Sequence, residues 1–266
     1  MAKKVVDYAG KQLPFKLGCR PTRLIVKLKL KDFVDLSKLP TPPKKFGHEN
    51  LIDPNVGPLG NDQYGCCVFA GAANEELMWC AEGETCTARF DPQVVLAAYA
   101  AVTGFNPDDP STDQGTDPVA AAKWRQQTGF TDADGNVHKI EAYLEIDQDD
   151  IAMIRIATWL FGAVGCGIQF PGSAMLQFQK GKPWTVVKGS AIEGGHYIPI
   201  VGDDGTDLLC RTWGQNQRVA KSFLKKECMT ALVYLTPEAI NRQTQRSPEG
   251  FAYEELKQEL KRLQGG

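Results

Sequence analysis

Residues 59–70 read Leu59-Gly60-Asn61-Asp62-Gln63-Tyr64-Gly65-Cys66-Cys67-Val68-Phe69-Ala70, a polar turn bracketed by glycines that leads into an apolar, alanine-rich run. This pattern predicts a loop that enters a helix, with a cysteine at the entry. At such a position the helix dipole and the unpaired N–H groups of the first turn stabilise a thiolate. The stretch therefore predicts a reactive cysteine.

A reactive cysteine needs a base, and the chain has only three histidines. His196 lies in the strand-like, glycine-opened run Glu193-Gly194-Gly195-His196-Tyr197-Ile198-Pro199-Ile200-Val201-Gly202. His48 and His138 lie in loop-like contexts, and we expect them at the surface. The candidate pair is therefore Cys67 and His196, and a thiolate held by His196 predicts rapid alkylation of Cys67 near pH 6.

The composition narrows the class of protein. The chain has 266 residues, of which 42% are hydrophobic and 23% charged, and its formal net charge is −2. These values predict a globular protein with no nucleic-acid or anionic-membrane partner. The N-terminus lacks the apolar core of a signal peptide, so a location in the cytoplasm of a bacterial host or in a virion is expected. The eight cysteines are irregularly spaced, and no metal or cofactor is expected.

The segment pattern predicts three regions. Residues 1–57, which carry prolines, lysines and an alternating run at 24–31, suggest an extended N-terminal strap or a propeptide-like segment that includes an edge strand. Residues 58–240 form the main domain, and residues 241–266 supply a charged C-terminal helix packed on it.

Within the main domain, helical patterns precede strand patterns. Helices are predicted at residues 66–79, 91–104, 117–129 and 151–163, with an acidic, solvated loop at 106–117. Strands are predicted near residues 138–146, 165–170, 196–201, 208–213 and 231–235. This order predicts an α+β protein with a helical lobe, an antiparallel sheet or barrel lobe, and a cleft between them.

The local motifs resemble those of papain-like cysteine peptidases. Gly65-Cys66-Cys67-Val68-Phe69-Ala70 resembles Gly-Ser-Cys-Trp-Ala-Phe, which puts Cys67 at the nucleophile position. Gly194-Gly195-His196-Tyr197 resembles the histidine strand of the family, and Arg211-Thr212-Trp213-Gly214 resembles its Asn-Ser-Trp-Gly. The chain also resembles uncharacterised papain-like proteins of bacteriophages and prophages, through its Gly-Asn-Asp-x-Tyr-Gly-x-Cys turn and Gly-Gly-His-Tyr strand.

The resemblance assigns roles to several side chains. Asn61 stands where the family has its oxyanion-hole glutamine, and Arg211 stands at the position of the asparagine that orients the histidine. Arginine has no acceptor for an imidazole N–H, so Gln215 or Asn216 is the possible substitute.

Two functions follow from the resemblance. The first is a cysteine peptidase that takes a peptide or protein substrate in the cleft between the lobes. The alternative is a catalytically weak or inactive papain-like module, such as a structural component of a phage virion that contacts other phage proteins. A thiol-dependent transferase or deamidase that uses the same pair is a third option.

Overall fold

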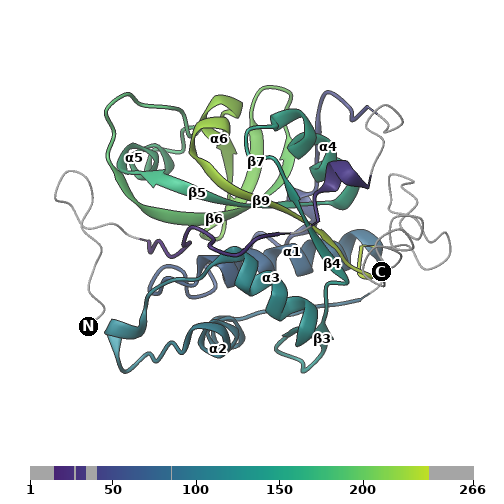
Figure 1. Cartoon of the computed structure of the whole chain (residues 1–266), viewed down its shortest axis with the longest axis vertical. Helices are drawn as coiled ribbons and strands as arrows, with labels where there is room; N and C mark the ends of the chain where they lie inside the picture. Colours follow the sequence, from purple (N-terminus) through teal and green to yellow (C-terminus); the bar gives the residue numbers. More distant parts are fainter. Residues whose placement is uncertain (1–14, 27, 34–40, 85, 240–266) are drawn as a thin grey trace.

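The computed structural model describes residues 15–26, 28–33, 41–84 and 86–239. The C-terminal helix predicted within residues 241–266 lies outside them. Six α-helices and a large antiparallel sheet make up the described chain, arranged as a helical lobe and a sheet lobe (Figure 1). The predicted α+β architecture with two lobes is confirmed.

The helical lobe contains three helices, α1 (Cys67–Gly83), α2 (Pro92–Thr103) and α3 (Pro118–Gln127). Their starts follow the capping signals in the sequence. Asp91 accepts hydrogen bonds from the backbone N–H groups of Gln93 and Val94, and Asp117 accepts one from Val119. In both helices a proline occupies the first position, where no backbone N–H is needed. A short hairpin of β2 (Phe130–Thr131) and β3 (Val137–His138) completes this lobe.

The sheet lobe is built on seven antiparallel strands in the order β4-β9-β5-β6-β7-β8, with β1 paired to β6. The strands are β1 (Phe46–Gly47), β4 (Ala142–Ile146), β5 (Val164–Pro171), β6 (Ile192–Asp203), β7 (Leu208–Thr212), β8 (Gln215–Val219) and β9 (Cys228–Leu235). The predicted hairpin of β6 and β7 is confirmed, with Ile200 opposite Cys210.

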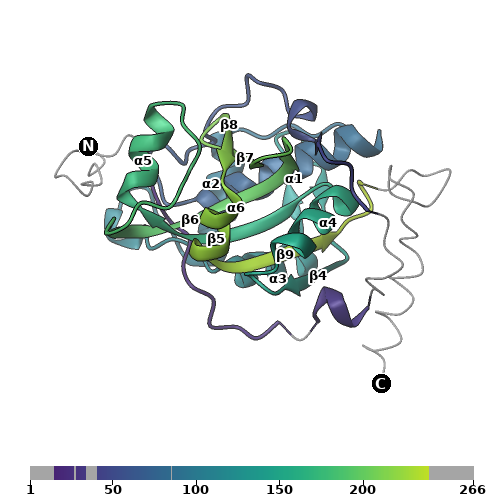
Figure 2. The ribbon, with the colours of Figure 1, turned by 90° about the horizontal axis from the view of Figure 1, so that it is seen from above.

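Three further helices belong to the sheet lobe, α4 (Ile151–Phe161), α5 (Gly172–Gln179) and α6 (Lys221–Glu227). Asp150 caps α4 by accepting a hydrogen bond from the Met153 N–H, as the sequence predicts. α4 and α6 pack on the strands β5, β6 and β9, as the view from above shows (Figure 2). Three short 3₁₀ turns, η1 (Leu30–Asp32), η2 (Glu49–Leu51) and η3 (Pro110–Thr112), lie in connecting segments.

α1 lies between the two lobes and packs directly on β6. A Cβ added at Gly71 of α1 would lie 2.5 Å from the Tyr197 ring, so only glycine allows this close approach. Behind this contact is a buried polar network. The Tyr197 hydroxyl donates to Glu75 (2.7 Å), and Arg125 of α3 pairs with Glu75 (2.7 Å) and Glu76 (2.9 Å). Each of these charged groups has an oppositely charged partner, which lowers the cost of placing them in a core.

The structure corrects two sequence-based expectations and adds two contacts that the sequence does not predict. The edge strand predicted at residues 24–31 is absent from the described part of that run, which contains an isolated bridge at Lys29 followed by η1. His48 and His138 are buried rather than at the surface, at 6% and 3% exposure. The loop at residues 106–117 is largely exposed, as predicted, and its Asp113 in addition accepts a hydrogen bond from the Gly65 N–H in the turn before Cys67. Cys80 and Cys86 form a disulfide that the sequence does not predict.

No helix among the described residues is long and apolar enough to cross a membrane.

We expect Arg125→Ala to lower the free energy of unfolding by about 3–5 kcal/mol, because it leaves two buried carboxylates without their counter-charge. Urea denaturation of the full chain measures this change. Lys123→Ala, on the exposed side of the same helix, is the matched control and is expected to stay within about 0.5 kcal/mol of the parent protein. Equal stability of the two variants would contradict the role assigned to the network.

Candidate active site

Cys67 is the first residue of α1, where the sequence predicts it. The turn before it is held in place by Asp113, which accepts hydrogen bonds from the Gly65 N–H (2.9 Å) and the Tyr99 hydroxyl (2.9 Å). Leu59 and Gly60 both adopt positive φ, so the turn is tight. Cys66 is also buried, and its thiol faces the Leu59 carbonyl. The turn therefore directs the two adjacent cysteines to different surroundings.

His196 lies on β6 and lines the same small cavity as Cys67. Its Nε2 lies 2.7 Å from the Thr212 hydroxyl on β7, and its Nδ1 has no hydrogen-bond partner among the described residues. A proton on Nε2 leaves the Nδ1 lone pair available to accept a thiol proton. The structure thus brings together a thiol and an oriented imidazole that are far apart in the sequence.

Aromatic rings cover the imidazole. The Trp213 indole stacks on the His196 ring with a centroid distance of 4.2 Å and an interplanar angle of 17°, and Phe170 meets the same ring edge-on. Trp213 has a φ of 46°, an uncommon backbone conformation for a residue of this size. The backbone turn that directly follows β7 therefore places the Trp213 indole over the His196 imidazole.

Within the described chain, Thr212 is the hydrogen-bond partner of His196, rather than Arg211 at the motif position or its possible substitutes Gln215 and Asn216. Arg211 points toward the loop before Cys67, where it donates to the Val56 carbonyl (2.9 Å), and it also donates to the Asn216 side chain (3.3 Å). Gln215 is exposed. Thr212, the residue next to Arg211, makes the hydrogen bond to the imidazole instead. Successive residues of a strand point to opposite faces, which explains why a shift of one position exchanges the two roles.

Asn61 lies at the same cavity, and the Nδ2 of its side chain makes two hydrogen bonds. Its Nδ2 donates to the Tyr64 carbonyl (2.9 Å) and to the Lys16 carbonyl (3.2 Å). The first bond fixes the amide within its own turn. The second bond goes to the N-terminal region, so this donor becomes available to another carbonyl only when Lys16 leaves.

Residues 15–20, which we call the covering segment, lie across the site between the two lobes (Figure 1). Gly18 and Cys19 both donate backbone hydrogen bonds to the Gly195 carbonyl, and Arg20 donates to the Thr116 carbonyl. The segment lies directly against the body: a Cβ added at Gly18 would lie 1.9 Å from the Gly65 oxygen. Phe15 stacks on Trp213 at a centroid distance of 5.0 Å.

The covered site holds its two reactive groups in their neutral forms. Cys67 and His196 are each 1% exposed, and the cavity that they share has a volume of about 10 Å³, room for about one water molecule. Burial raises the pKa of the Cys67 thiol to about 12, and hydrogen bonds from backbone N–H groups such as those of Tyr197 and Gly18 oppose this only in part. Burial also lowers the pKa of His196 to about 3. The closed arrangement therefore differs from the ion pair that the sequence predicts.

Comparison with solved structures identifies the architecture. Xylellain, a cysteine protease from Xylella fastidiosa, superposes with a TM-score of 0.65 and 13% identity over 85% of this chain and 98% of its own. The chain has the papain-like fold. ProCathepsin B S9 from Trypanosoma congolense (TM-score 0.59, 12% identity, 89% of this chain and 93% of its own) shares it. Digestive procathepsin L 3 of Tenebrio molitor larval midgut also shares it, with a TM-score of 0.57 and 15% identity over 76% of this chain and 72% of its own.

The sequence itself matches no protein-family model and no curated protein. At these levels of identity the papain-like architecture is established by the backbone arrangement. The chemistry has to be argued from the side chains of this chain.

We expect the alkylation rate of Cys67 in the intact chain to rise about tenfold for each pH unit between pH 7 and 9. The thiol pKa of about 12 lies above this range, so the thiolate fraction increases as the pH approaches it. Iodoacetamide labelling followed by mass spectrometry of the Cys67 peptide measures the rate, with Cys67→Ser as the control for peptide assignment. A rate that is constant between pH 5 and 8 would mean that the thiolate already exists in the covered site.

Proposed function

We propose that this protein is a papain-like cysteine peptidase held in a latent form by its covering segment. The observation that carries the proposal is the convergence of Cys67, an imidazole oriented by Thr212, and the Asn61 amide on one cavity that the chain itself closes. Peptides and proteins are the proposed substrates.

The proposed chemistry uses these groups in sequence. His196 Nδ1 accepts the Cys67 proton, and Sγ attacks the carbonyl carbon of a peptide bond. The negative charge that develops on the carbonyl oxygen is stabilised by the first-turn N–H of Cys67 and by Asn61 Nδ2. His196 then donates its proton to the leaving amine, which leaves a thioester on Cys67. Water attacks the thioester with His196 as base, releasing the acid and restoring the thiol.

The covering segment accounts for latency in physical terms. It occupies the Asn61 donor through the Lys16 carbonyl, and it removes Cys67 and His196 from water. Charge separation between thiol and imidazole is unfavourable in such surroundings. When the segment leaves, water enters and the ion pair becomes accessible. The exposed run at residues 23–25, where Ile25 is 89% exposed, is a suitable place for a cut that releases the segment.

The proposed removable part ends before Phe46, because the residues that follow belong to the body. Phe46 and Gly47 pair with β6, and the His48 N–H donates to the Val201 carbonyl. Ile52 is buried, and Val56 binds Arg211. Removal of residues up to 57 would take away this supporting loop.

Gly18→Ala tests the latency. The added methyl meets the Gly65 carbonyl oxygen, so the covering segment has to move away. We expect alkylation of Cys67 at pH 6 to become at least about tenfold faster and cleavage of an unfolded protein substrate to appear. Arg20→Ala, which removes an exposed side chain from the same segment, is the matched control and is expected to behave as the parent chain.

Activity in the Gly18→Ala background then identifies the chemistry. Cys67→Ser is expected to abolish cleavage, whereas Cys66→Ser, its immediate neighbour, retains it. Thr212→Val is expected to lower kcat by about tenfold or more, because the imidazole loses the hydroxyl that orients it. Thr212→Ser keeps this hydroxyl and is expected to have a kcat near that of the parent. Cleavage that survives Cys67→Ser would exclude the proposed nucleophile.

A second candidate function is a papain-like binding module without hydrolysis, for example a virion component. The neutral, sealed pair of Cys67 and His196 favours this candidate. Its prediction differs from that of the peptidase: neither Gly18→Ala nor removal of the covering segment by limited proteolysis would produce cleavage. The association with bacteriophages is proposed from the sequence motifs alone.

A further inference from the structure

A second cluster of side chains, of kinds that can bind a metal, lies beside α1 about two and a half turns beyond Cys67. It contains Glu76 of α1, His138 of β3 and Glu238, which follows β9. One ligand atom from each of the three residues lies within 4.8 Å of the other two. Three segments that are distant in the sequence thus meet at one buried point.

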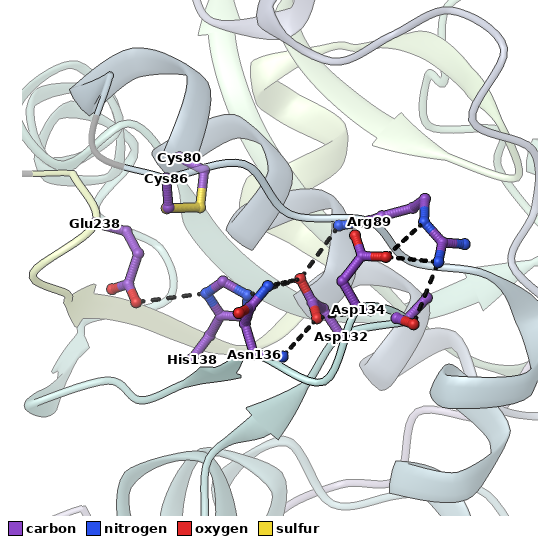
Figure 3. A network of polar contacts seen from close by, with 9 residues as sticks. Cys80, Cys86, Arg89, Asp132, Asp134, Asn136, His138 and Glu238 are labelled. Atoms are coloured by element: carbon purple, nitrogen blue, oxygen red, sulfur yellow. Dashed lines mark hydrogen bonds and ion pairs between the residues drawn. A yellow bond between two sulfur atoms is a disulfide. The ribbon is translucent and has the colours of Figure 1, made fainter.

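His138 is held between two carboxylates (Figure 3). Its Nδ1 lies 3.5 Å from Glu238 Oε1, and its Nε2 lies 3.4 Å from Asp132 Oδ2. Asp132 is itself fixed by backbone N–H groups of the hairpin turn, from Asp134 (2.9 Å) and Asn136 (2.8 Å). A carboxylate behind one nitrogen of an imidazole orients the other nitrogen toward a metal in many proteins.

Glu76 contributes an oxygen without a partner. The residue has no solvent exposure, and its Oε1 accepts a hydrogen bond from Arg125 (2.9 Å). Its Oε2 is buried and has no hydrogen-bond partner among the described residues. A buried carboxylate oxygen without a donor is costly, and a cation is one way to satisfy it.

The carboxylates around this cluster lie close to one another. Glu75 and Glu76 both pair with the guanidinium of Arg125, while Asp132 and Glu238 lie beside His138. Buried carboxylates are generally paired with cations or coordinate metals, so a bound cation suits the unpartnered Glu76 oxygen.

We propose that Glu76 Oε2, His138 Nδ1 and Glu238 Oε1 bind a zinc ion, with a fourth position open to water. An imidazole together with carboxylates suits zinc, whereas calcium and magnesium prefer sites made of oxygen alone. Tetrahedral zinc needs ligand atoms roughly 3.5 Å apart, so the side chains have to approach by about 1 Å. Asp132 is a positioning residue that holds His138 from behind.

The disulfide next to the site decides which ligands are available. The sulfurs of Cys80 and Cys86 also lie within 4.8 Å of His138, but they are bonded to each other. As a disulfide they supply no thiolate for a metal. The proposed site therefore uses the two carboxylates and the imidazole in the disulfide-bonded protein.

Such an ion would link α1 to the β2–β3 hairpin and to the segment after β9. Its expected effect is on stability, since Glu76 lies on the helix that carries Cys67 but away from the catalytic cavity. We expect the full, disulfide-bonded chain to bind one equivalent of zinc. At a free zinc concentration of a hundred times Kd, Tm is expected to rise by roughly 5–10 °C.

The experiment combines zinc titration in a metal-buffered solution with thermal unfolding and elemental analysis after dialysis. Glu238→Gln and His138→Gln are each expected to weaken zinc binding at least about a hundredfold, and Asp132→Asn about ten- to a hundredfold. Asp134→Asn is the matched control from the same hairpin. Asp134 binds Arg89 and stands outside the cluster (Figure 3), so its variant should bind zinc as the parent does.

Far-UV circular dichroism shows whether each variant folds. If His138→Gln does not fold, Glu238→Gln still tests the site, because Glu238 lies nearer the surface. Cobalt substitution provides a second measurement, since a tetrahedral site with one imidazole gives visible absorption that Glu238→Gln should alter. The proposal is overturned if the disulfide-bonded chain binds no zinc, or if Glu238→Gln leaves binding unchanged. Binding that appears only after a dithiol reduces the disulfide, and is lost in Cys80→Ser, would overturn it as well.

Discussion

The hydrogen bond between the Tyr197 hydroxyl and Glu75 connects the two lobes at the point on which the active site depends. Tyr197 directly follows His196 on β6, and Glu75 lies on the same helix as Cys67. The bond therefore fixes the helix against the strand that carries the base. Burial raises the pKa of Glu75, and the Arg125 guanidinium 2.7 Å away opposes this rise and offsets part of the cost of placing the carboxylate in the core. The position of the Cys67 thiol relative to the His196 imidazole thus depends on hydrogen bonds in which neither residue takes part.

Enclosure by the covering segment bears directly on the proposed function. Burial raises the pKa of the Cys67 thiol and lowers that of His196, so the enclosed pair is neutral. If the protein is a latent peptidase as proposed, the change of surroundings alone accounts for latency without any distortion of the two side chains. Under that proposal, activation requires only that the segment leaves.

Local signals in the sequence were enough to predict most of the helices, and they selected Cys67 and His196 as the candidate pair. Asp91, Asp117 and Asp150 cap helices where the pattern predicts them, and Cys67 and His196 line one cavity. The predictions that failed concern contacts between distant segments. Alternation of side chains along β7 places Thr212 against His196 and directs Arg211 to the loop before Cys67. Aligning the motif by counting back from Trp213 does not show which of these two side chains meets the imidazole.

The burial of His138 depends on how the β2–β3 hairpin and the segment after β9 meet α1, and neighbouring residues in the sequence carry no signal of that meeting. The Cys80–Cys86 disulfide is instead a local link with a sequence separation of 6, from α1 to the residues just after it. The run at residues 24–31 alternates as a strand does, yet the chain there makes only an isolated bridge at Lys29. Alternation predicts which faces a strand would present, and it does not supply a partner strand.

Main-chain recognition of the covering segment has a consequence for how this region changes over evolutionary time. Gly18, Cys19 and Arg20 are held through their backbone N–H groups, which every residue except proline provides. Lys16 and Arg20 are therefore the positions that can vary most freely, whereas Phe15, Leu17 and Cys19 pack on the body and Gly18 is under steric constraint. Homologous segments could share a path across the site while sharing only a pattern of apolar side chains around one glycine.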